Sequence, residues 1–153
     1  MLLACAALAG ATAAKADTPP KIGMWNYAEV ATFCSIGTTA NGSALILMTS
    51  KSGASGVMLK PADQSAIVAG TDYPLKVSMN GSADFDITAN AGEFGGAKVL
   101  FLPIKGNKIA AGEADGFALR ASLNGAVLFD KDMHGSHDAF AAFVACGAKF
   151  PQS

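Results

Sequence analysis

The polar residues best able to do chemistry lie in one short run that contains both histidines of the chain. Imidazole and carboxylate groups are the donors that Zn²⁺ and Cu²⁺ accept in proteins. The candidate metal ligands are His134, His137, Asp132 and Asp138. The chain has no third histidine to complete a three-histidine site, and the alternative is a structural loop in which Ser136 and Asp138 begin a helix. We prefer the structural interpretation and predict no metal and no other cofactor.

The same run begins like a calcium-binding loop, with Asp130 and Asp132 at positions 1 and 3 and Gly135 at position 6. Position 12 of an EF-hand loop carries a Glu that binds calcium through both oxygens, and here that position is Ala141. The EF-hand interpretation is therefore excluded.

A serine hydrolase would need His134 or His137 as the base of a Ser–His–Asp arrangement. The sequence has no G-x-S-x-G elbow, and Ser136 between the two histidines is too local to indicate a triad. We therefore predict a protein without catalytic activity, with a hydrolase as the less favoured alternative.

The N-terminal residues are typical of an export signal. Residues 1–10 form an apolar stretch without charge, and the small residues Ala14 and Ala16 fit the rule for signal peptidase cleavage. We expect a signal peptide over residues 1–16 and a mature domain over 17–153, in the periplasm or outside the cell. No Lys or Arg precedes the apolar stretch, so we expect the natural start to lie upstream. The stretch is too short to span a bilayer, so we predict no transmembrane segment.

Removal of the signal would discard Cys5 and leave two cysteines, Cys34 and Cys146. In an oxidising compartment, an even pair of cysteines in a small exported domain is expected to be bonded. Two buried free thiols are the alternative. We predict a disulfide between Cys34 and Cys146 that closes a loop almost as long as the domain.

The composition excludes two classes of protein. Half of the chain (51%) is apolar and 15% is charged, which excludes a disordered low-complexity protein. Loss of Lys15 leaves 10 basic against 12 acidic residues, a net charge of −2, and Arg120 is the only Arg. Nucleic-acid binding needs a concentrated basic surface. We therefore predict no nucleic-acid partner.

Short segments between frequent glycines predict a mainly β fold. The 17 Gly residues and several Asn-Gly and Gly-Ser pairs separate segments of five to eight residues, a spacing typical of a sandwich or barrel. The first segments expected as strands are residues 25–27, 30–36, 44–48 and 56–60. Residues 44–48 are apolar on both faces, which favours a central position in the sheet. Trp25, Tyr27 and Phe33 are expected in the core, with an exposed aromatic patch as the alternative.

The clearest strand covers Tyr73–Met79, where apolar and polar residues alternate. Its expected partner covers Ala83–Ala89. A two-residue Asn80-Gly81 turn would place Val77 opposite Asp84, so an odd loop is required, and it then pairs Val77 with Phe85.

The rest of the chain continues the β pattern and then changes period. Residues 99–102, 117–123 and 127–131 are expected as strands, Asn124-Gly125 as a turn and residues 108–114 as a short helical turn. Phe140, Phe143 and Val144 then have helical spacing. We expect Ser136 to cap this helix and Gly147 to end it. The predicted fold is a single antiparallel β-sandwich or barrel-like domain whose C-terminal helix is held by the disulfide.

From Asp72-Tyr73-Pro74-Leu75 to the Gly135–Phe140 segment, the order is strand, hairpin, apolar strand, helical turn, two strands and a Phe-containing helix. This order resembles the C-terminal half of small alphaproteobacterial export proteins of the invasion-associated locus B type. Trp25 before Cys34 adds to the likeness. The resemblance implies a periplasmic or surface β domain with no known catalytic residues.

These observations favour a non-catalytic binding or structural protein of the periplasm or the cell exterior, with a protein or another envelope component as partner. A metal-binding protein that uses His134 and His137 is the alternative.

Overall fold

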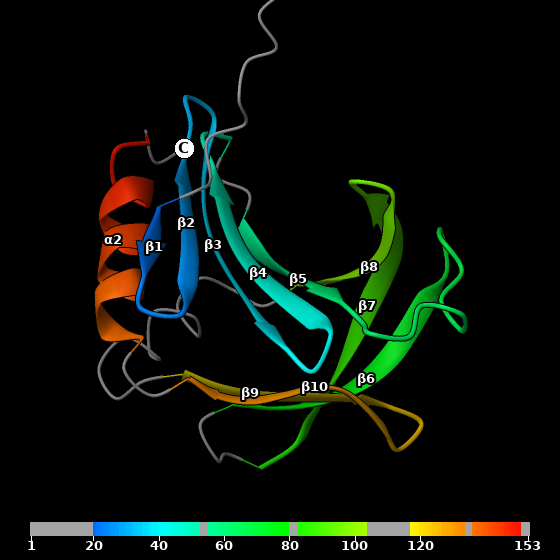
Figure 1. Ribbon diagram of the computed structural model, residues 1–153. Helices are drawn as coiled ribbons and strands as arrows, with labels where there is room; N and C mark the ends of the chain where they lie inside the picture. The colour runs from blue at the N-terminus through cyan, green and yellow to red at the C-terminus, as the bar shows by residue number, and fades with distance from the viewer. Residues whose placement is uncertain (1–19, 53–54, 80–82, 104–116, 134–135, 151–153) are drawn as a thin grey trace, which may run out of the picture.

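The computed structural model describes residues 20–52, 55–79, 83–103, 117–133 and 136–150 (Figure 1). The strands are β1 (Lys21–Ile22), β2 (Trp25–Glu29), β3 (Phe33–Ala40), β4 (Ser43–Ser50), β5 (Ser55–Lys60), β6 (Asp72–Met79), β7 (Phe85–Phe94), β8 (Ala97–Leu102), β9 (Phe117–Leu123) and β10 (Ala126–Met133). One helix, α2 (His137–Gly147), follows them. The predicted helical turn at residues 108–114 lies outside the described residues.

All ten strands belong to one antiparallel sheet, in the order β1-β2-β3-β4-β5-β8-β7-β6-β9-β10. The sheet curls, so that β9 and β10 cross below the ends of the other strands in Figure 1. Two hydrogen bonds join β10 to the β3–β4 hairpin: Ser43 Oγ donates to the Leu128 carbonyl (2.6 Å) and Lys131 Nζ donates to the Thr39 carbonyl (2.7 Å). The predicted antiparallel, barrel-like domain is therefore confirmed, as a single curled sheet.

The register of the β6–β7 hairpin is the predicted one. Val77 pairs with Phe85, and Leu75 pairs with Ile87. The loop residues 80–82 lie outside the described part of the chain. Strand β7 continues to Phe94, five residues beyond the predicted end, because its second half pairs with β8.

The turns at the β3–β4 and β9–β10 hairpins use Asn-Gly pairs. Asn41 and Gly42 have φ of 50° and 80°, and Asn124 and Gly125 have φ of 50° and 82°. Two consecutive left-handed residues match the twist of the flanking strands, and Asn and Gly accept that conformation at low cost. The predicted turn at Asn124-Gly125 is thus confirmed.

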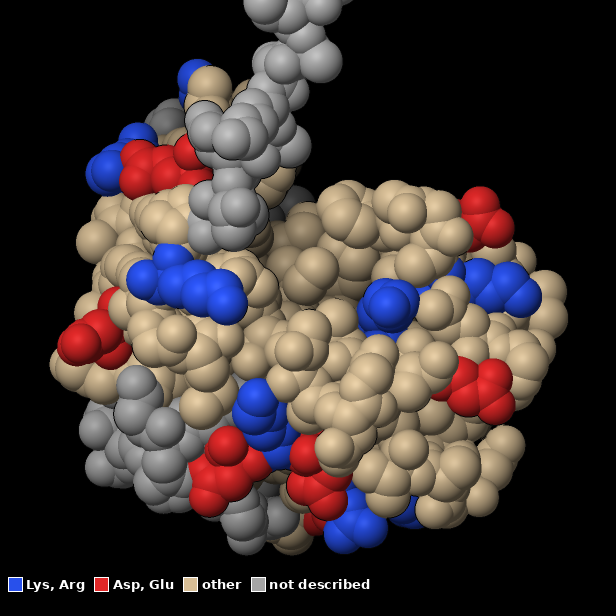
Figure 2. Space-filling model, viewed as in Figure 1, with Lys and Arg blue, Asp and Glu red and all other residues tan. Residues whose placement is uncertain are grey.

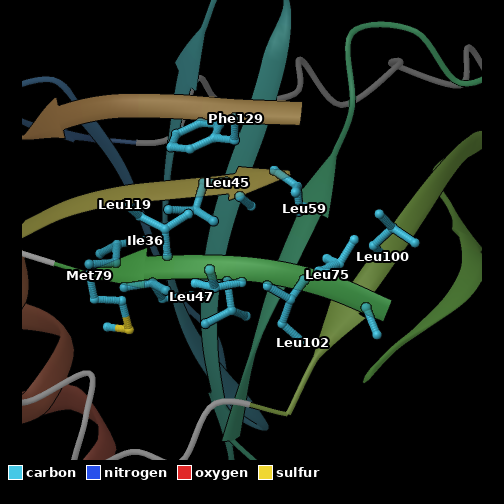
Figure 3. Packing of buried hydrophobic residues seen from close by; sticks show 14 of the residues in the cluster. Ile36, Leu45, Leu47, Leu59, Leu75, Met79, Leu100, Leu102, Leu119 and Phe129 are labelled. Carbon is cyan, nitrogen blue, oxygen red and sulfur yellow. The ribbon is translucent and has the colours of Figure 1, made fainter. Parts of the chain in front are cut away.

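The inner face of the curled sheet holds the core. Figure 3 shows leucines from opposite parts of the sheet that point toward one another, including Leu45 and Leu47 of β4, Leu75 of β6 and Leu119 of β9. All four side chains are at most 1% exposed. Each fully buried aliphatic or aromatic side chain contributes about 1.5–3 kcal/mol, so this face supplies most of the stabilisation.

Helix α2 covers one end of this core and is covalently tied to the sheet. The predicted disulfide is present between Cys34 of β3 and Cys146 of α2, with a Cα–Cα distance of 6.1 Å. Trp25 of β2 meets Phe140 of α2 edge to face, with ring centroids 5.4 Å apart. Gly147 lies close to β4, since an added Cβ would come within 3.1 Å of Thr49 Cγ2.

Two details predicted for the helix are wrong. Val144 is 40% exposed, because the buried arc of the helix is formed by Ala139, Phe143 and Cys146, with Phe140 at its edge. Ser136 occupies the N-cap position, but its side chain makes no capping hydrogen bond. Its φ and ψ of −80° and 0° are not the extended values that aim a capping hydroxyl at the helix.

Candidate binding groove on the outer face of the sheet

The residues predicted as metal ligands do not form a described cluster. Asp132 lies near the end of β10, and His137 and Asp138 begin α2, all with exposed side chains. His134 lies outside the described residues. Within the described ranges, no group of three or more His, Cys, Asp and Glu side chains is placed to hold a metal ion. The metal site stays a hypothesis.

The outer face of the sheet is divided into a charged half and a mostly apolar half. The charged half covers β6, β9 and β10, where Lys76 forms an ion pair with Asp86 of β7 (3.1 Å) and Arg120 with Asp130 (3.8 Å). In Figure 2, acidic and basic side chains gather at the lower edge, where β9 and β10 lie in Figure 1. Such a mixture of signs is typical of a solvated strand face.

The mostly apolar half of the outer face covers β3, β4, β5 and β8, which carry two charged residues, Lys60 and Lys98. Strand pairing aligns Ile46 of β4 with Met58 of β5, and Met58 with Phe101 of β8. Because side chains alternate along a strand, these residues point away from Leu45, Leu47 and Leu59 of the core. An apolar row on the solvent side of an antiparallel sheet is unusual, since that side is ordinarily polar.

A groove of about 410 Å³ runs across this mostly apolar half. Met58 lies at its floor and is 2% exposed, whereas Phe33 and Phe101 remain 36% and 38% exposed. The described lining residues also include Met48 and Pro103, and none of the described lining residues is charged.

Gly92 of β7 shapes the groove through the side chain it lacks. An added Cβ at this position would lie 2.9 Å from Cε2 of the Phe101 ring. The ring therefore lies against the bare backbone of β7. A larger residue at position 92 would push the ring away from β7.

The lining residues at the two ends of the groove are polar and uncharged. At one end, Ser55 Oγ donates to Thr49 Oγ1 (3.1 Å), and Ser50 hydrogen bonds with Ser52 (2.8 Å). At the other end, the Asn90 side-chain amide donates to Asp72 Oδ1 (2.9 Å). The groove thus has an apolar centre and a few polar groups at its ends, which is typical of a small-molecule site.

A second cavity of about 480 Å³ opens at the end of the barrel, between the two Asn-Gly turns and the segment that follows β5. Its buried hydroxyl, Ser43 Oγ, already donates to the Leu128 carbonyl and accepts from the Ala62 amide (3.0 Å). Asp63 accepts from the Ser65 amide (2.9 Å), and hydrogen bonds from the Ser65 hydroxyl and amide lower the pKa of that carboxyl. These polar groups hold the local fold, so this cavity is the weaker candidate.

A polar network joins β2 to the residues that follow α2. Glu29 accepts from Lys149 Nζ (2.6 Å) and from Tyr27 Oη (2.8 Å), and these bonds lower the pKa of Glu29. Burial, together with the bond to Glu29, raises the pKa of Tyr27 to about 12. Glu29 is thereby kept ionised and Tyr27 protonated at neutral pH, so the network holds structure rather than exchanging protons.

Sequence reasoning did not identify the groove, although one signal pointed to it. Residues 44–48 are apolar on both faces, a pattern we interpreted as a central strand. Strand β4 does lie inside the sheet, between β3 and β5, but its Ile46 and Met48 face outward and are half-buried. Of the aromatic residues expected in the core, Trp25 is buried and Tyr27 is half-buried, but Phe33 lines the groove.

No family model, no curated protein and no solved structure matches this chain. Among the described residues, no helix has both the length and the apolar character needed to cross a membrane. Arguments about function therefore depend on the geometry of the chain itself.

Proposed function

We propose that the protein is an exported, non-catalytic binding protein of the periplasm or the cell exterior, and that the groove over β4, β5 and β8 is its binding site. The observation that carries the proposal is the uncharged, apolar groove on the solvent side of the sheet. Exposed apolar patches on soluble domains mark interaction sites. The Cys34–Cys146 disulfide is consistent with an oxidising compartment.

The cleaved signal over residues 1–16 and an envelope component as partner belong to the same proposal. The resemblance of the second half of the chain to export proteins of the invasion-associated locus B type points the same way. A metal-binding function through His134 and His137 remains the alternative, without a described cluster in its favour.

A charge placed in the groove is expected to abolish the retention of envelope material on the immobilised protein. Met48→Glu puts a carboxylate among the apolar lining residues, and an apolar ligand would then have to desolvate it. Met24→Glu is the matched control, because Met24 is 43% exposed and does not line the groove. The measurement is the amount of extract retained by the wild type and by each variant, with melting temperatures recorded alongside. Equal retention by both variants and the wild type would contradict the proposed site.

A further inference from the structure

We infer that the groove binds the hydrocarbon chain of a detached, single-chain anionic amphiphile of the fatty-acid class. The chain would lie over Met58, between Phe33 and Phe101, with its head group at the Ser50 end. This inference rests on the proposed function and adds the class of ligand and its orientation.

The size of the groove favours a small molecule over a macromolecule. A volume of about 410 Å³ falls within the range of small-molecule sites, about 300–1,000 Å³. The described lining residues number 13. A stable protein–protein interface uses about 20–30 residues on each side. A second copy of this chain would therefore gain too little contact from the groove.

The lining chemistry favours a flexible hydrocarbon chain. Without a charged residue among the described lining positions, nothing there would compensate a charge on the body of the ligand. Met48 and Met58 are unbranched, so their thioethers can adapt to different chain conformations. Burial of each methylene against these side chains adds to the binding free energy.

The two ends of the groove differ in charge, and this difference orients the ligand. At the Ser50 end, Ser50 and Ser55 are lining residues, and Lys51, whose side chain is exposed, follows Ser50 directly in the chain. At the opposite end, Asn90 is bonded to the carboxylate of Asp72. Opposite charges attract, so a carboxylate head group is favoured at the Ser50 end and disfavoured beside Asp72.

Calorimetric titration with laurate, below the concentration at which it forms micelles, tests the inference. We expect saturable binding to the wild type and roughly tenfold weaker binding to Phe101→Ser, because the variant removes one apolar wall. Phe94→Ser should bind as the wild type does, since Phe94 is 54% exposed and lies outside the groove lining. Dodecyltrimethylammonium should bind more weakly than laurate, and Lys51→Glu should reduce that preference.

Met48→Glu serves as a second groove variant if Phe101→Ser lowers the melting temperature. Absence of laurate binding, or equal binding by the wild type and both groove variants, would overturn the inference. If laurate does not bind but the retention of envelope material still depends on Met48, the ligand class is wrong and the proposed function stands. A dimer in sedimentation that Met48→Glu dissociates, without laurate binding, would assign the groove to a second copy instead.

Discussion

Replacement of both Cys34 and Cys146 by Ala is expected to lower the free energy of unfolding by about 4–5 kcal/mol. The two cysteines are 112 residues apart, so their bond removes many conformations from the unfolded chain. Domains of this size have a total stability of about 5–15 kcal/mol, so the variant should be close to unfolding. Urea unfolding followed by far-UV circular dichroism measures the difference.

The wild type in reducing buffer is the matched control and should lose a similar amount of stability. An unchanged urea midpoint in both cases would contradict the role assigned to the bond. Two thiols that react with maleimide in the native protein would contradict the bond itself.

Val77→Asp is expected to destabilise the protein by several kcal/mol, because it buries an unpaired carboxylate. Val77 is fully buried in β6, where it pairs with Phe85 of β7 and Ala121 of β9. Asp84→Ala is the control: Asp84 is exposed, and its loss should change stability by no more than about 0.5 kcal/mol. Thermal and urea unfolding of both variants would show the difference, and equal, small effects would mean that the inner face is wrongly identified.

Local patterns in the sequence predicted the parts of the fold that depend on neighbours in the chain. The β6–β7 register followed from the need to keep Val77 and Phe85 on one face, and the structure pairs them. The helix followed from the spacing of Phe140 and Phe143, both buried. Such patterns work because a shift of one residue would move a whole strand's apolar side chains into water.

The pairing of distant strands could not be predicted in the same way. Strand β5 pairs with β8, and β6 pairs with β9, and no local pattern distinguishes these partners from others. The exposed position of Val144, in contrast, could have been predicted. The predicted disulfide at Cys146 determines which side of the helix meets the sheet, and Val144, two residues earlier, lies on the other side.

The groove was missed because an outward apolar residue and a core residue look alike in a sequence. Ile46 and Leu47 are neighbours in one apolar segment, but only Leu47 faces the core. The outward apolar row can be recognised only when β4, β5 and β8 are placed side by side, because their pairing aligns Ile46, Met58 and Phe101. The apolar row then differs clearly from the charged half of the outer face, which carries ion pairs.

Photo-crosslinking in cells that export the protein is the most direct test of whether the groove binds an envelope ligand. The photoreactive residue p-benzoylphenylalanine, which inserts into nearby C–H bonds, would replace Phe101 in one variant and Phe94 in another. Phe101 lines the groove, whereas Phe94 is exposed on the same β7–β8 hairpin and is not among the lining residues. We predict an adduct of defined added mass at position 101 and none at position 94 after irradiation. No adduct at position 101, or the same adducts at both positions, would contradict the assignment of the groove as the binding site.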